Sequence, residues 1–155
     1  MRYEFCFQDK EKVYLPLLSK LKQADLVFVG GSTGENVEPC IAMLREHTNA
    51  PLIIFPGNAS QFSPQADALL FLTLLNARTA DMLIEPHVQM AIPIHKSGIE
   101  AIPMGYILID GGRKSSVEIV SNCDPIPQSE IGRIVSTAIA GQLLGKQLIY
   151  LEAGS

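Results

Sequence analysis

LIYLEAGS, residues 148–155, is the most informative segment of this sequence. An apolar run over residues 148–151 ends in an acid, a small residue, a glycine and a hydroxyl. This order is typical of a buried parallel strand that delivers polar groups to the carboxyl edge of an α/β sheet. The Gly154-Ser155 step offers backbone N–H groups and a hydroxyl that suit a phosphate, and Glu152 offers a carboxylate beside it. An ordinary strand end with a turn is the competing interpretation of so short a motif.

The composition favours a single domain over residues 1–155. With 47% hydrophobic and only 18% charged residues, many elements should be buried on both faces, as in parallel sheets. Twelve Lys and Arg against sixteen Asp and Glu give a net charge of −4, which disfavours nucleic acid and anionic membrane surfaces as partners. The three cysteines form no CxxC pair, which indicates a reducing compartment and argues against zinc. Without a signal peptide or a bilayer-spanning apolar stretch, we expect a cytoplasmic, soluble protein.

Short apolar runs alternate with amphipathic segments along the chain. Strands are expected at residues 3–7, 26–29, 52–55, 68–75, 106–109 and 148–151. Helices are expected at residues 14–22, 36–47, 81–95 and 129–144, the last with Ser129 as its N-cap and Gly145 just past its end. After a tight turn at residues 110–112, the alternation over residues 115–120 predicts a hairpin arm. Strands separated by helices imply right-handed crossovers and a parallel sheet of about six βα units.

Two further loops follow predicted strands. Residues 30–34, Gly-Gly-Ser-Thr-Gly, could bring backbone to a phosphate, and Ser32 could bind phosphate or a hard cation such as Mg²⁺. A tight turn with a helix-capping hydroxyl explains the same residues equally well, because the lysine of a P-loop and the GxGxxG spacing are both missing. Residues 55–60 could place Asn58 or Ser60 over the same edge, although a loop with unusual backbone angles is the simpler interpretation.

Histidines and nucleophiles add no recognisable site. The histidines at positions 47, 87 and 95 are far apart and form no HExxH motif, so surface or hydrogen-bonded structural roles are expected. The sequence has no GxSxG motif and no cysteine with an evident base. Chemistry must therefore come from carboxylates, hydroxyls, backbone amides and a metal.

Several motifs occur together in a familiar order. They are Val29-Gly30-Gly31-Ser32, residues 51–57 (PLIIFPG), residues 68–76 (ALLFLTLLN), Met104-Gly105-Tyr106, Ser116-Val117, Asn122 and residues 150–155 (YLEAGS). From about Tyr14 to Ser155 the sequence resembles the geranylgeranylglyceryl phosphate synthase family, which includes the heptaprenylglyceryl phosphate synthases, in the branch with the YLEAGS ending. Several motifs in one order are far more specific than any of them alone.

The resemblance implies a TIM (β/α)8-barrel type of α/β fold and a prenyltransferase. Enzymes of this family join sn-glycerol 1-phosphate to a polyprenyl diphosphate, forming an ether and releasing pyrophosphate. The contacts to glycerol phosphate would come from Tyr150, Leu151, Glu152, Ala153, Gly154 and Ser155. Glu152 would orient the attacking hydroxyl and accept its proton, Tyr150 would order the same face, and Ser32 would be a ligand of the cofactor Mg²⁺.

Two departures from the family pattern bear on these expectations. The family's first strand ends in Asp-Pro-Asp-Lys, whereas this chain has Phe7-Gln8-Asp9-Lys10, so that Asp9 could replace the metal-binding aspartate only by moving. The Gly-Gly and Gly-Asn loops of the family's last two βα units have no counterpart, which leaves an incomplete barrel with open edges at its first and sixth strands.

Several alternatives remain open. A fragment, a split gene product or a remnant could each give this sequence, and a remnant would bind a phosphorylated ligand without turnover. An aldolase or isomerase on the same barrel is disfavoured, because no strand end carries a lysine for a Schiff base. Exposed strand edges favour a homo-oligomer or a larger parent chain over a monomer.

Overall fold

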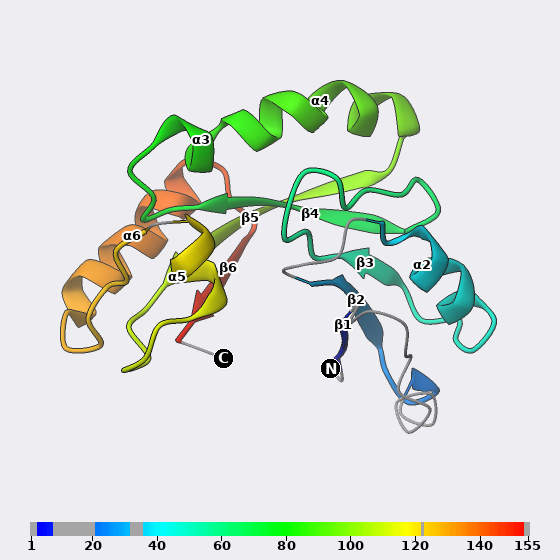
Figure 1. The fold of residues 1–155 in the computed structure, drawn as a ribbon, viewed down its shortest axis with the longest axis horizontal. Coiled ribbons are helices and arrows are strands. Elements are labelled where there is room, and N and C mark those ends of the chain that lie inside the picture. The colour runs from blue at the N-terminus through cyan, green and yellow to red at the C-terminus, as the bar shows by residue number, and fades with distance from the viewer. Residues whose placement is uncertain (1–2, 8–20, 32–35, 122, 154–155) are drawn as a thin grey trace. The chain divides into compact units, whose positions relative to one another are not determined.

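The computed structural model describes residues 3–7, 21–31, 36–121 and 123–153, with strands and helices in alternation (Figure 1). The strands are β1 (Tyr3–Phe7), β2 (Leu26–Gly30), β3 (Leu52–Ile54), β4 (Ala68–Leu74), β5 (Glu100–Leu108) and β6 (Leu148–Glu152). The helices are α2 (Glu38–Arg45), α3 (Ala80–Leu83), α4 (Glu85–Ser97), α5 (Ser116–Ser121) and α6 (Ile131–Leu143). The helix expected at residues 14–22 lies almost wholly outside the described residues.

The strands form one sheet in chain order, from β1 to β6. β2 pairs with β1 and β3, β3 pairs with β4, and β5 pairs with β6, each time in parallel. Each of the six predicted strands is confirmed, although β5 begins at Glu100 rather than at residue 106. Parallel pairing puts the carboxyl ends of β1 to β4 on one edge, and it does the same for β5 and β6; α/β proteins place their binding sites at such edges.

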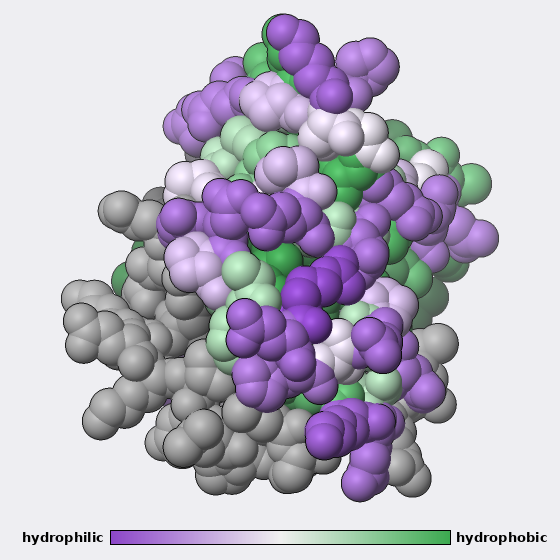
Figure 2. Space-filling model, turned by 90° about the vertical axis from the view of Figure 1, so that its right-hand side faces the viewer, coloured by the Kyte–Doolittle hydropathy of each residue, from purple (hydrophilic) through white to green (hydrophobic). Residues whose placement is uncertain are grey.

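The chain divides into two compact units. The first comprises residues 1–70 and 90–101, and the second comprises residues 71–89 and 102–155. In the first unit, Ile41 and Leu44 of α2 are fully buried, as their helical spacing predicts. The opposite face of α2 is polar, and Figure 2, which looks at the side where α2 lies in Figure 1, shows hydrophilic side chains over most of its coloured surface.

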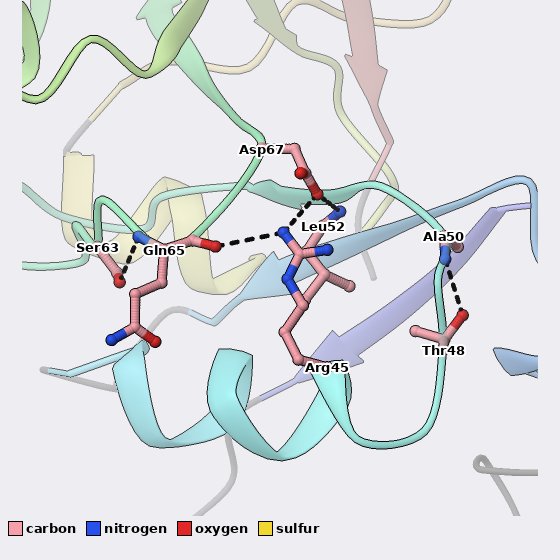
Figure 3. Close-up of polar contacts among 7 residues, drawn as sticks. All are labelled: Arg45, Thr48, Ala50, Leu52, Ser63, Gln65 and Asp67. Carbon is pink, nitrogen blue, oxygen red and sulfur yellow. Dashed lines mark hydrogen bonds and ion pairs between the residues drawn. The ribbon is translucent and has the colours of Figure 1, made fainter.

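Asp67 joins α2 to the start of β3 (Figure 3). Its Oδ2 accepts a 2.7 Å hydrogen bond from the backbone N–H of Leu52 and lies 2.6 Å from Nη2 of Arg45. Arg45 also donates to the carbonyl of Gln65. Because the carboxylate satisfies an N–H of β3 directly, it contributes more than an exposed ion pair alone would.

Two glycines allow α6 to pack closely on the sheet of the second unit. A Cβ on Gly141 of α6, or on Gly105 of β5, would lie 2.6 Å from Cδ1 of Leu75. The core below consists of Ile107, Ile109 and Ile126, with Leu75, Ile134, Ala138 and Ile149 packed against it. The missing side chains therefore let α6 cover the face of β5 and β6 that carries Ile107 and Ile149.

The region predicted as one helix over residues 81–95 is two helices. α3 ends at Leu83, and α4 begins at Glu85, so that Pro86 falls in the first turn, where a missing N–H costs no hydrogen bond. Pro93 lies inside α4, where its ring removes one hydrogen bond of the helix.

Two local predictions are wrong. Residues 115–120 do not form a hairpin arm, because α5 is a helix, and Oγ of Ser115 accepts a hydrogen bond from the N–H of Glu118, as an N-cap does. Six alternating residues are too few to distinguish the two-residue period of a strand from the 3.6-residue period of a helix. Glu130 rather than Ser129 occupies the N-cap of α6, whereas Gly145 does follow the helix with a φ of 89°.

In the described part of the chain, no helix is both long and apolar enough to cross a bilayer.

Candidate functional site

The carboxyl end of β6 carries a buried acid. Glu152 is 9% exposed and lies opposite Leu108 of β5, while Tyr150 lies opposite Tyr106. Residues two apart on a strand point to the same face, and paired residues of parallel strands share that face. The register therefore places Tyr106, Tyr150 and Glu152 on one face of the sheet, opposite the face that α6 covers.

The two tyrosines and the acid interact directly. The rings of Tyr106 and Tyr150 stack with centroids 5.2 Å apart and planes 28° from parallel. Burial, the negative charge of Glu152, the neighbouring Tyr150 and a hydrogen bond with Glu152 together raise the pKa of Tyr106 far above its usual value of 10.0. The phenol of Tyr106 therefore stays protonated and donates to the carboxylate of Glu152. Sequence reasoning assigned Tyr106 to a strand and a motif but to no site.

Asn76 was expected in an exit loop and is instead buried between strand ends. It is 3% exposed, and its side-chain amide bonds to both backbone groups of Leu108 and to the carbonyl of Asp124. The sequence does carry a hint of this role, because Asn76 is a single amide at the end of a long apolar run. An amide that is buried there needs hydrogen-bond partners.

The predicted glycerol phosphate contacts are brought together only in part. Tyr150 and Glu152 share a face, whereas Leu151 points to the opposite face and is 53% exposed. Ala153 is exposed beyond the end of the strand. Gly154 and Ser155 lie outside the described residues, as do Asp9 and the predicted metal ligand Ser32.

The exits of β2 and β3 meet in the first unit. A Cβ on Gly30 would lie 1.9 Å from the carbonyl oxygen of Phe55, so only glycine fits there. The buried side chain of Gln61 donates to the carbonyl of Gly31 and accepts from the N–H of Gly57. The loop that leads to residues 32–35 is thus held against the loop after β3.

In the same region, Asn58 and Ser60 do not point to a ligand. The side-chain oxygen of Asn58 accepts hydrogen bonds from the N–H and the hydroxyl of Ser60 within their own loop. This supports the simpler interpretation of that segment as a structured loop.

The histidines have structural surroundings. Nδ1 of His47 lies 2.9 Å from the carbonyl of Met43, and His95 is exposed. His87 is buried, packs edge-on against Phe71 and has Nε2 3.2 Å from Oγ1 of Thr73. Within the described ranges, no group of three or more His, Cys, Asp or Glu residues could hold a metal ion.

Comparisons with known proteins show the family to which this chain belongs. The model of the PcrB family matches residues 16–155, which is most of the chain. The chain belongs to the PcrB family. Among relatives of this PcrB-family chain, the geranylgeranylglyceryl phosphate synthase of Flavobacterium johnsoniae is 48% identical over 143 residues, covering 90% of this chain and 59% of the relative. That of Zunongwangia profunda is 45% identical over 145 residues, covering 92% of this chain and 62% of the relative.

Solved structures give the same result for the fold. The (S)-3-O-geranylgeranylglyceryl phosphate synthase from Thermoplasma acidophilum, solved in complex with its substrate sn-glycerol-1-phosphate, matches with a TM-score of 0.86 and 31% identity. The match covers 99% of this chain and 65% of that chain. The predicted fold class is confirmed: the PcrB-family chain is α/β of the TIM-barrel type, with a sheet of six strands in the described residues. The chain spans about three fifths of the length of the relatives that it matches.

Proposed function

We propose that this chain provides the glycerol phosphate site of a prenyltransferase that joins sn-glycerol 1-phosphate to a polyprenyl diphosphate such as geranylgeranyl diphosphate. The observation that carries the proposal is the buried carboxylate of Glu152 at the carboxyl end of β6, with Tyr106 and Tyr150 on the same face. The names of the relatives support the reaction, and the Thermoplasma acidophilum complex supports glycerol phosphate as a substrate.

The proposed chemistry is an alkylation of a hydroxyl. Glu152 orients the C3 hydroxyl of glycerol phosphate and accepts its proton, while the oxygen attacks C1 of the allylic diphosphate. A C–O ether bond forms, the bond from C1 to the diphosphate oxygen breaks, and pyrophosphate leaves with the electron pair. Because the phenol of Tyr106 stays protonated, it holds the carboxylate and does not compete with it for the proton.

The residues near Glu152 would order the small substrate. Tyr150, stacked on Tyr106, presents a rigid aromatic surface beside the carboxylate. We propose that the backbone after Glu152, through Ala153, Gly154 and Ser155, binds the phosphate, as the resemblance implies. Leu151 points to the other face, so its part would be a backbone contact.

Magnesium remains part of the proposal, with Ser32 as one ligand. When bound, Mg²⁺ would neutralise the charge of the leaving diphosphate. The first aspartate of the family's Asp-Pro-Asp-Lys motif is replaced by Phe7, so a complete ligand set has to draw on other groups, such as Asp9. A reducing compartment such as the cytoplasm is likewise proposed, on the three cysteines without a CxxC pair, and self-association is proposed on the outer strands β1 and β6.

A second candidate function is ligand binding without turnover. The replacement of the metal-binding aspartate favours it. In this case the carboxylate and the tyrosines would still bind a phosphorylated alcohol.

Two measurements on the 155-residue chain test the proposal. The first is calorimetric titration with sn-glycerol 1-phosphate, with sn-glycerol 3-phosphate as the control ligand. The second is incubation with sn-glycerol 1-phosphate, labelled geranylgeranyl diphosphate and Mg²⁺, with extraction of labelled lipid. Turnover that falls by a factor of about 10²–10⁴ in Glu152→Gln supports catalysis, as expected for loss of a general base. Binding without turnover supports the second candidate, and binding of neither substrate overturns both.

A further inference from the structure

Hydrogen bonds hold the carboxyl end of β5 on both of its edges, beside Glu152 of β6. On one side, the N–H of Ile109 donates a 2.7 Å hydrogen bond to the backbone carbonyl of Glu152. On the other side, β4 ends at Leu74, and the N–H of Leu75 just after it donates to the carbonyl of Tyr106. The next N–H of β5 on that side belongs to Leu108, and it donates to a side chain. That side chain belongs to Asn76.

The amide of Asn76 satisfies three groups at once. Its Oδ1 accepts from the N–H of Leu108 at 3.0 Å, and its Nδ2 donates to the carbonyls of Leu108 and Asp124 at 3.2 and 3.0 Å. These three partners determine the orientation of the amide, because the flipped amide would direct its oxygen at two carbonyls. The thiol of Cys123 donates a hydrogen bond to the backbone carbonyl of Asn76.

The partners of Asn76 also fix the segment after α5. Ile126 forms a parallel bridge with Ile109, with hydrogen bonds to Leu108 and Asp110. Asn76 ties this segment to β5 through Asp124. The carbonyl of the Leu108-Ile109 peptide is therefore held by the side chain of Asn76 and the N–H of Ile126, and its N–H is held by Glu152 of β6.

We propose that Asn76 is a positioning residue for Glu152, acting through the backbone of Leu108 and Ile109. It touches no substrate in this role. It fixes the strand from which Glu152 receives its backbone hydrogen bond and on which Tyr106, the donor to the Glu152 carboxylate, also lies. The consequence for glycerol phosphate binding rests on the proposed function, whereas the consequence for the geometry of the strand end does not.

The test compares Asn76→Ala and Asn76→Asp with the unchanged chain. Asn76→Ala leaves the buried N–H of Leu108 without a partner, and Asn76→Asp keeps the acceptor but directs a carboxylate oxygen at two carbonyls. Ala140→Gly in α6 is the control, because Ala140 is exposed and lies outside the core cluster that includes Ile109, so that the change destabilises the same unit through helix propensity alone.

The first readout is amide hydrogen exchange, which does not depend on any ligand. In both Asn76 variants we expect exchange at Ile109 to rise at least about tenfold above that in Ala140→Gly at matched global stability, because a buried N–H without a partner lowers the free energy of local opening. Tyrosine near-UV circular dichroism should change with it, since Tyr106 and Tyr150 form a stacked pair. Unchanged protection at Ile109 and an unchanged tyrosine signal would overturn the positioning role.

The second readout is titration with sn-glycerol 1-phosphate. We expect affinity to fall about tenfold or more in the Asn76 variants and to stay within about twofold in Ala140→Gly. If the unchanged chain binds no glycerol phosphate, the proposed function fails, while hydrogen exchange still decides the role of Asn76. Full affinity in Asn76→Ala together with faster exchange would limit Asn76 to a structural role and so overturn the inference.

Discussion

Nε2 of Gln61 donates a 2.6 Å hydrogen bond to the backbone carbonyl of Gly31, thirty residues earlier in the chain. The other end of the same side chain accepts from the N–H of Gly57 at 2.8 Å. Gln61 is 1% exposed, so both bonds are shielded from water. One buried amide thus joins the loop after β2 to the loop after β3.

Replacing Gln61 tests this connection. Gln61→Glu retains an acceptor for Gly57 but removes the donor to Gly31, so we expect the free energy of unfolding to fall by about 1–3 kcal/mol. Urea denaturation followed by circular dichroism measures it. The same change at the exposed Gln89 of α4 is the control and should cost less than about 0.5 kcal/mol. Equal effects at the two positions would show that the buried bridge contributes nothing.

A second prediction concerns the close approach of Gly30 to Phe55. In Gly30→Ala the new methyl group would overlap a backbone carbonyl, which cannot move as a side-chain end can, so we expect a loss of about 1–3 kcal/mol or more. Gly132→Ala in α6 is the matched control, because nothing lies within 4 Å of its Cβ. It should stabilise the protein by about 0.5–1 kcal/mol through helix propensity. Thermal unfolding of both variants decides between these opposite signs.

Tyr106 and Glu152 should be energetically coupled. Tyr106→Phe keeps the stacked ring but removes the donor to a buried carboxylate, and we expect it to cost about 1–3 kcal/mol. In a double-mutant cycle with Glu152→Gln, the coupling energy should reach about 1 kcal/mol, because each change removes the same hydrogen bond. Additive losses in urea denaturation would contradict a direct interaction.

The pH dependence of stability should include a contribution from His87. Burial, followed by the charge of Lys146, lowers the pKa of His87 below its usual value of 6.5, although the carbonyl of Leu72 offsets part of this. As pH falls below about 6.5, the unfolded chain takes up a proton that the folded chain does not, so stability decreases until the folded pKa is reached. Above about pH 6.5 the contribution is constant, because neither state then binds the proton.

His87→Gln isolates this contribution, because glutamine can still bond to Thr73 but does not titrate. The difference in the free energy of unfolding between the two proteins should change by up to about 1.4 kcal/mol per pH unit below pH 6.5 and stay flat above it. Parallel stability curves from pH 5 to 8 would rule out a lowered pKa.

Asp67 and Arg45 should contribute unequally. Arg45→Ala removes an exposed partner and should cost less than about 1 kcal/mol. Asp67→Ala also leaves the N–H of Leu52 without its acceptor, so a larger loss of about 1–3 kcal/mol is expected. Chemical denaturation of the two variants compares them, and a larger loss for Arg45→Ala would contradict this account.

Local patterns of apolar residues predicted most strands and helices, because the buried side of each element leaves a period in the sequence. The apolar run 68–75 is β4, and the spacing of Ile41 and Leu44 placed the buried face of α2. The same reasoning failed at residues 115–120, where a serine cap and a short alternating run were compatible with both periods. The N-cap hydrogen bond between Ser115 and Glu118 favours the helix over the strand.

The site was predictable where a strand end carries its own chemistry. Glu152 and Tyr150 follow from their place in β6, and their shared face follows from the two-residue period. Tyr106 and Asn76 were not predictable as partners of this site. Strand register brings Tyr106 beside Tyr150 and Glu152, and the side chain of Asn76 bonds to the N–H of Leu108 in place of a backbone partner. Both arrangements depend on contacts between residues that are distant in sequence.

The amino-acid sequence by itself determined the order of the six strands, the parallel sheet and the family, because these depend on local hydrophobic periods and on motifs that can be read in order. Only the tertiary structure decided that Tyr106 meets Glu152, that Asn76 holds Leu108, and that Leu151 points away from them. The physical reason is that strand register is set by packing between segments dozens of residues apart, and a shift of one residue would exchange the two faces.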